Sequence, residues 1–158
     1  MMDTYLQMLK ESLDKKIEIL NQILQYEEQQ QEMVKQENFD YEAFDKSVNE
    51  KVVLVDQIDA LDDGFEKVYD RIRSELFLNK EKYAEQIRVL QNQISEITDK
   101  NVAIQAMESR IKMAVDNRVK KDRLDLQQRR NSGKAAQSYY SNMRKLNYVD
   151  AQFMDRKK

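Results

Sequence analysis

The sequence has no proline, cysteine, histidine or tryptophan, and only two glycines among its 158 residues. Proline and glycine interrupt helices and form tight turns, so their scarcity excludes a fold made of hairpins and short loops. At its average frequency of about 5%, proline would occur roughly eight times in a chain of this length. We therefore expect an all-α protein built from long helices.

The missing residue types also exclude several kinds of active site. A chain without cysteine has no thiol nucleophile, disulfide or thiolate metal ligand. A chain without histidine lacks the commonest general base and the commonest zinc ligand. Gly64 and Gly133 are isolated, so they cannot form a glycine-rich phosphate-binding loop. We expect a protein that is not an enzyme and that uses no cofactor and no metal ion.

Long apolar stretches are absent too. No run approaches the roughly 20 residues that cross a bilayer, and the N-terminal segment lacks the apolar core of a signal peptide. Hydrophobic residues make up 41% of the chain, which is enough for narrow apolar stripes along helices. We expect a cytoplasmic protein that does not insert into membranes.

The first helix is expected at about residues 4–36. Thr4 and Gln7 have the spacing of a capping box at a helix start. Apolar residues then recur at steps of three and four, which places them on one helix face: Leu6, Leu9, Leu13, Ile17, Leu20 and Leu24. After Tyr26 the stretch EEQQQE contains no apolar residue, so we expect the apolar seam to weaken there.

A chain reversal is expected at residues 37–40. Asp40 can cap the following helix through its carboxylate. Phe39 and Phe44 occupy the two positions of a hydrophobic staple, which fixes the angle at which the chain enters a helix.

A series of positions seven residues apart runs from Tyr41 to Ile111 and is apolar at every position except Asp62. Before residue 76 a second set of apolar residues mostly lies three positions after the series, as Phe44 and Ile58 do. Beyond residue 83 this second set lies four positions after the series, as Ile87 and Ile94 do. Such a phase change indicates a break, and Asn79 can cap a new helix. We expect helices at about 40–78 and 80–130, with one straight helix of about 90 residues as the alternative.

The predicted fold is an elongated antiparallel three-helix bundle or coiled coil with a long third helix. The bundle covers residues 1–131, since the third helix is expected to end near Gly133. Residues 132–158 form a C-terminal tail that is partly disordered or that folds on binding, because it is richer in aromatic side chains than a purely solvating tail.

Charge is unevenly distributed along the chain. Residues 1–108 contain 13 basic and 24 acidic side chains, whereas residues 109–158 contain 14 and 5. The basic run from Arg118 to Arg130 alternates with acidic residues and has no interleaved aromatic side chain for base stacking. We interpret the run as a solvated helix face, and a nucleic-acid partner is not expected.

Most apolar seam positions are expected to pack within the bundle. The alternative is that the end of the third helix, together with the tail, forms a partner-binding surface of adaptable apolar side chains. The residues predicted to form this surface are Met107, Ile111, Val115, Tyr139, Tyr140, Met143, Leu146, Tyr148 and Phe153.

Several segments together resemble a known family. They are the opening LQMLKESLDKKIEILNQIL, the reversal ENFDYEAF, the second-helix segment EKVVLVDQIDALDDGFEKVYDRI, the heptads of QNQISEITDKNVAI and the ending YVDAQFMDRKK. In this order the chain resembles the FlgN-type flagellar export chaperones of bacteria over essentially its full length.

The resemblance implies a cytosolic chaperone of flagellar type III export. Members of that family bind the C-terminal helical segments of hook-associated (hook–filament junction) proteins, prevent their premature assembly and deliver them to the export apparatus. The family's use of its C-terminal region for client capture maps onto the far part of the third helix and the tail. The alternative is a structural coiled-coil or adaptor protein that self-associates, and a homodimer is left open.

Overall fold

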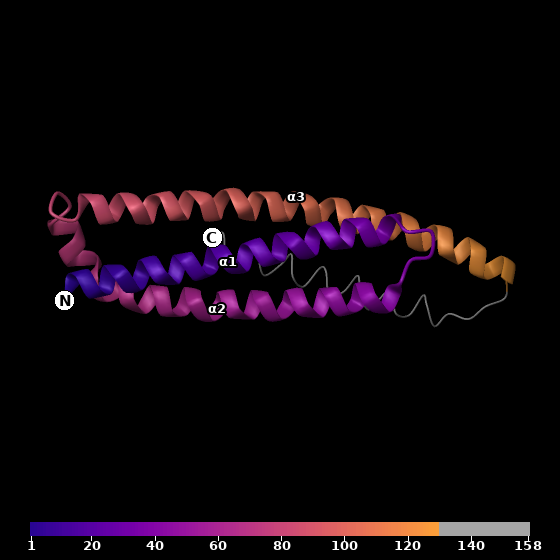
Figure 1. Cartoon of the computed structure of the whole chain (residues 1–158), viewed down its shortest axis with the longest axis horizontal. Helices are drawn as coiled ribbons and strands as arrows, with labels where there is room; N and C mark the ends of the chain where they lie inside the picture. The colour runs from indigo at the N-terminus through magenta and orange to yellow at the C-terminus, as the bar shows by residue number, and fades with distance from the viewer. Residues whose placement is uncertain (130–158) are drawn as a thin grey trace. The chain divides into compact units, whose positions relative to one another are not determined.

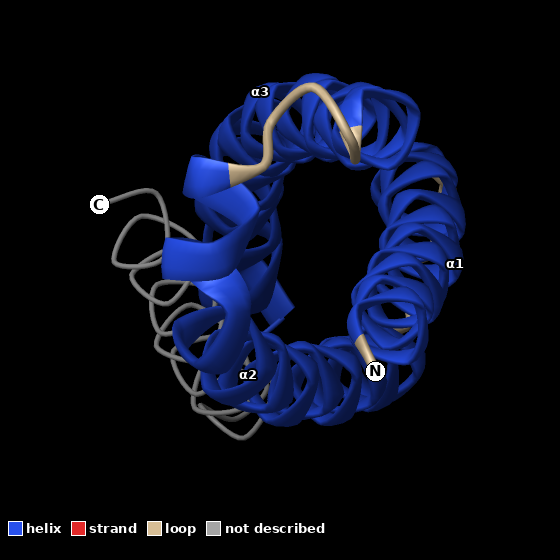
Figure 2. Ribbon diagram, turned by 90° about the vertical axis from the view of Figure 1, so that its left-hand side faces the viewer, coloured by secondary structure: helices blue, strands red, loops and turns tan. Residues whose placement is uncertain are grey.

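The computed structural model describes residues 1–129, and these form three helices and no strand (Figures 1 and 2). The helices are α1 (Met2–Lys35), α2 (Tyr41–Leu78) and α3 (Ala84–Arg129). The all-α class and the long third helix, which has 46 residues, are thereby confirmed. Helices α2 and α3 are separate, so the alternative of one straight helix is wrong. The predicted tail at 132–158 lies outside the described residues.

The chain divides into two compact units, and each contains segments of all three helices. Unit 1 consists of Met1–Gln22 and Asp56–Asn101. Unit 2 consists of Ile23–Val55 and the chain from Val102 onward, of which the structure describes residues up to 129. Each turn reverses the chain, so α1 and α2 run antiparallel, as do α2 and α3 (Figure 1).

Burial in each unit follows the expected helical periodicity. In unit 1 the buried apolar side chains recur at steps of three, four and seven and include Leu6, Leu9, Leu13, Ile58, Ile72, Leu90 and Ile97. In unit 2 one apolar cluster joins the three helices and contains Val34, Phe39, Phe44, Val48, Ile111, Val115 and Val119. Removing such side chains from water is the main force that holds helices of this kind together.

The reversal between α1 and α2 has the predicted cap and staple. Asp40 Oδ1 accepts a hydrogen bond from the backbone N–H of Ala43 at 3.0 Å, which satisfies one of the open amides of the first turn. The rings of Phe39 and Phe44 pack edge to face with centroids 5.4 Å apart, and both are buried. Both predictions for this segment are confirmed.

The start of α1 differs from the predicted one. The helix begins at Met2, and Thr4 lies inside its first turn, so Thr4 is not the capping residue. The backbone N–H of Tyr5 donates to the carbonyl of Met1 at 3.2 Å. Met2 is buried, and this apolar contact favours a helix that begins ahead of the polar capping pattern.

The break between α2 and α3 lies where expected, but Asn79 caps the end of α2 and not the start of α3. Its side-chain amide donates to the carbonyl of Glu75 at 2.8 Å, and its backbone N–H donates to the same carbonyl at 3.1 Å. Asn79 therefore closes the C-terminal end of α2 and does not cap α3. Helix α3 begins only at Ala84, after a turn at residues 79–83 that contains the buried ring of Tyr83.

We expect replacement of Gly64 by alanine to stabilise the protein. Gly64 lies within α2, is exposed, and has no atom within 4 Å of the position that a Cβ would take. Alanine is favoured over glycine inside a helix by about 1 kcal/mol. The Gly64→Ala variant should therefore raise the urea midpoint with an unchanged slope. The control is Ala60→Gly one turn earlier in the same helix, which should lower the midpoint; a lower midpoint for Gly64→Ala would contradict the described backbone.

Candidate functional site

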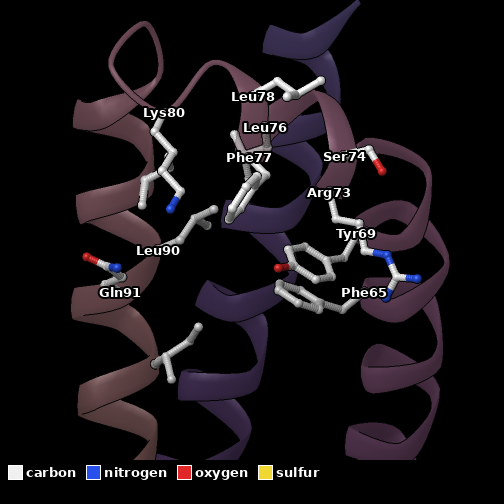
Figure 3. Close-up of a pocket in the computed structure, with 12 residues that line it drawn as sticks. Phe65, Tyr69, Arg73, Ser74, Leu76, Phe77, Leu78, Lys80, Leu90 and Gln91 are labelled. Carbon is white, nitrogen blue, oxygen red and sulfur yellow. The ribbon is translucent and has the colours of Figure 1, made fainter.

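An apolar groove of about 900 Å³ lies on the surface of unit 1. It is formed by the last turns of α2, the following turn and the first turns of α3 (Figure 3). Its volume lies within the range of about 300–1,000 Å³ that is usual for binding sites. The lining residues are Phe65, Tyr69, Arg73, Ser74, Leu76, Phe77, Leu78, Lys80, Ile87, Leu90, Gln91 and Ile94.

The groove exposes large apolar side chains to an unusual degree. The exposed fractions are 67% for Phe77, 81% for Leu78, 42% for Tyr69 and 48% for Ile94. Leu76 and Leu90, by contrast, are buried. Scattered apolar residues are normal on a protein surface, but several gathered in one groove are typical of an interaction site.

Part of the predicted core seam of α2 opens into this groove. Phe65 and Tyr69 belong to the apolar pattern that was expected to pack within the bundle, yet Phe65 is only half-buried and Tyr69 is exposed. Their rings stack one turn apart with centroids separated by 6.1 Å and planes inclined by 16°. The stacked pair presents a flat apolar wall, on the side of the groove that belongs to α2 (Figure 3).

Two cations and no anion line the groove. The ammonium of Lys80 lies 4.1 Å from the centroid of the Phe77 ring, which is a cation–π contact. The guanidinium of Arg73 lies 3.7 Å from the carboxylate of Asp70, and both side chains are largely exposed. Ion pairs at such exposed positions are weak, so Arg73 can change partners at little cost.

A second notable feature is a layer of polar side chains buried in unit 2, here called the polar layer. Lys51 is fully buried, and its ammonium donates to Glu27 at 2.7 Å, Gln30 at 2.8 Å and Glu108 at 3.3 Å. The amide of Gln30 donates to the hydroxyl of Ser47 at 2.7 Å. The layer thus takes residues from all three helices.

Burial in the polar layer shifts the pKa of one of its carboxyl groups, that of Glu27. Burial raises the pKa of Glu27 to about 8, and the carboxylate of Glu108 raises it further while Lys51 opposes the shift. Glu27 is then protonated at pH 7. One oxygen each of Glu27 and Glu108 is buried without a partner among the described residues. A proton on Glu27 supplies the donor that this carboxyl pair lacks.

Heptad positions contain the signal that identifies this layer. Glu27 lies seven residues after Leu20 and seven before Val34, and Lys51 lies seven after Phe44. The stretch EEQQQE was interpreted as a weakened seam, but two of its residues, Glu27 and Gln30, continue the seam with polar side chains. Charges of opposite sign on seam positions of different helices indicate a buried polar contact.

Comparisons with protein-family models, with curated proteins and with solved structures found no match. Within residues 1–129, no helix is long and apolar enough to span a bilayer, and no three carboxylates gather in a way that could hold a metal ion.

The predicted partner surface at the end of α3 needs correction. Ile111 and Val115 are each 1% exposed and belong to the apolar cluster of unit 2. They are core residues, because α1 and α2 cover this part of α3, so we no longer assign them to a partner-binding surface. Met107 is half-buried. The other predicted positions lie outside the described residues: Tyr139, Tyr140, Met143, Leu146, Tyr148 and Phe153.

Arg118 also differs from its interpretation as part of a solvated face. Its guanidinium donates to the backbone carbonyls of Val34, Gln36 and Glu37 and lies 5.8 Å from the centroid of the Phe39 ring. These carbonyls belong to the end of α1 and the segment after it, where backbone acceptors lack helical partners. Arg118 therefore closes α1, and the positive charge also suits the negative end of the helix dipole.

Proposed function

We propose that this protein is a cytoplasmic flagellar export chaperone that binds the C-terminal helical segments of hook–filament junction proteins. In this proposal it shields those segments before assembly and delivers them to the export apparatus. The observation that carries the proposal is the exposed apolar groove of unit 1, to which we assign client binding.

The groove has the chemistry that an amphipathic helix requires. Phe77, Leu78 and Ile94 are exposed and can be covered by a partner, while the buried Leu76 and Leu90 form a fixed floor. The lining positions on α2 extend from residue 65 to residue 78, which corresponds to about 20 Å along a helix. A partner helix can therefore place anchors at i, i+3 or i+4, and i+7 along it. Binding of this kind is reversible, as release of a client demands.

The test is calorimetric titration with a synthetic C-terminal segment of a junction protein from the same organism. The double variant Phe77→Ser/Leu78→Ser should bind it about 100-fold more weakly, because two large apolar contacts are lost. Both residues are exposed, so the variant should keep its helical circular dichroism.

The matched control replaces two equally exposed apolar residues outside the groove. Met113 and Leu124 lie on α3 in unit 2 with exposed fractions of 68% and 63%. The variant Met113→Ser/Leu124→Ser should bind the segment as the unchanged protein does. Equal binding by the groove variant would contradict the assignment of the groove.

A second candidate function is a self-associating coiled-coil or adaptor protein, for which the same exposed groove could serve as the contact between two copies. Light scattering distinguishes the two. A stable dimer that Phe77→Ser/Leu78→Ser dissociates, together with no binding of the junction-protein segment, would favour the adaptor. A monomer that binds the segment supports the chaperone.

A further inference from the structure

We propose that the groove selects an amphipathic partner helix that carries a carboxylate on each flank of its apolar face, and that Arg73 and Lys80 make this selection. The inference rests on the proposed function, since it specifies the chemistry of the helix that the groove binds. It follows from the placement and the present contacts of the two cations.

The two cations lie on opposite sides of the apolar floor. Figure 3 shows Arg73 on the side formed by α2 and Lys80 toward α3, with Leu76 and Phe77 between them. A helix in the groove therefore has one cation beside each of its flanks. Unit 1 as a whole contains 15 acidic and 10 basic side chains, so a lining with two cations and no anion is not a consequence of its composition.

Lys80 gives the stronger reason for an acidic partner. Its ammonium lies over the exposed ring of Phe77, so a partner that covers this ring also removes water from the ammonium. A charge that loses water is costly unless it gains an opposite charge or hydrogen bonds. A carboxylate on the partner supplies both. Within the described chain, no carboxylate lies within ion-pair distance of Lys80.

Arg73 is available for the same role on the other flank. Its pair with Asp70 is long at 3.7 Å and exposed, so the guanidinium can turn to a partner carboxylate, with which it can form a two-pronged pair. Unit 1 has an acidic excess that opposes such a partner at long range, but salt screens charges beyond about 8 Å in physiological conditions. Local pairs at the groove therefore decide the preference.

The test uses three synthetic helical peptides of 20 residues with one shared apolar face of leucine and phenylalanine at i, i+3, i+4 and i+7. Their flanking positions hold glutamate, glutamine or lysine. We expect the glutamate peptide to bind the full-length protein about 10-fold more tightly than the glutamine peptide, because two partly desolvated ion pairs form. The lysine peptide should bind most weakly, and added salt should reduce the differences.

Charge reversal provides the decisive variant. Arg73→Glu/Lys80→Glu should reverse the order and prefer the lysine peptide. The control Lys67→Glu/Arg71→Glu changes the net charge equally on exposed positions of α2 that do not line the groove, and it should keep the original order.

The outcomes separate this inference from the proposed function. Equal binding of the three peptides, or an unchanged order in Arg73→Glu/Lys80→Glu, would overturn the charge selection and leave helix binding in the groove intact. An equal change in peptide preference in Lys67→Glu/Arg71→Glu would also overturn the charge selection, because the effect would then come from net charge. Binding of none of the peptides, nor of the junction-protein segment, would overturn both proposals.

Discussion

Replacement of Lys51 by methionine is expected to lower the free energy of unfolding by about 3–5 kcal/mol at pH 7. Lys51 is fully buried and donates to Glu27, Gln30 and Glu108. Methionine fills a similar volume but removes the buried ammonium that pairs with the carboxyl groups of Glu27 and Glu108. A buried charge that loses its partner is far more costly than the pair is stabilising.

Urea unfolding monitored by circular dichroism measures this effect, and two companion variants define its origin. Lys10→Met removes an exposed ammonium that pairs with Asp14 at 3.0 Å one turn away, and it should change stability by less than about 1 kcal/mol. The triple variant Glu27→Leu/Lys51→Met/Glu108→Leu removes all three ionisable groups of the polar layer. It should be about as stable as the unchanged protein, or more stable. Unchanged stability in Lys51→Met alone would contradict the buried contacts of Lys51.

The stability of the protein should fall as the pH rises from about 5 to about 8. Burial raises the pKa of Glu27 to about 8 in the folded protein, whereas its ordinary value is 4.5. Between these values the folded protein holds a proton that the unfolded chain has released. Folding then takes up a proton, and the free energy of unfolding decreases with pH by up to about 1.4 kcal/mol per unit. Above about pH 8 Glu27 is ionised in both states, and the decrease ends.

Because the chain has no histidine, the pH dependence of stability between pH 5 and 8 can be assigned to Glu27. Histidine is the side chain that ordinarily changes charge between pH 5 and 8, and the chain has none. Glu27→Gln mimics the protonated carboxyl and retains an acceptor for Lys51, so this variant should show a nearly flat profile over the same range. A slope as steep as that of the unchanged protein would show that Glu27 is not the group responsible.

The number of helices and their reversals could be predicted because their signals are local. The cap at Asp40 and the Phe39–Phe44 staple act within a few residues, and the phase change near residue 79 is visible in the periodicity alone. The role of Asn79 could not be predicted in the same way, since an asparagine beside a break can serve either helix.

The groove and the polar layer depend on which seam positions of different helices meet, and periodicity within one helix does not decide this. Phe65 and Tyr69 lie on a regular apolar series, yet they line an open groove. Ile111 and Val115 were expected at a free helix end, because the sequence does not tell how far α1 and α2 extend along α3. The buried ion pairs of Lys51 with Glu27 and Glu108 form only when the three helices pack together.

The most direct test of the groove as the client site is methyl NMR of the full-length protein during titration with the junction-protein segment. We expect the signals of Leu76, Ile87 and Leu90 to shift, since these residues line the groove. The signals of Ile111 and Val115, which lie in the core of unit 2, should stay in place. Shifts confined to residues beyond Val102, with no change at the three groove residues, would contradict client binding in the groove.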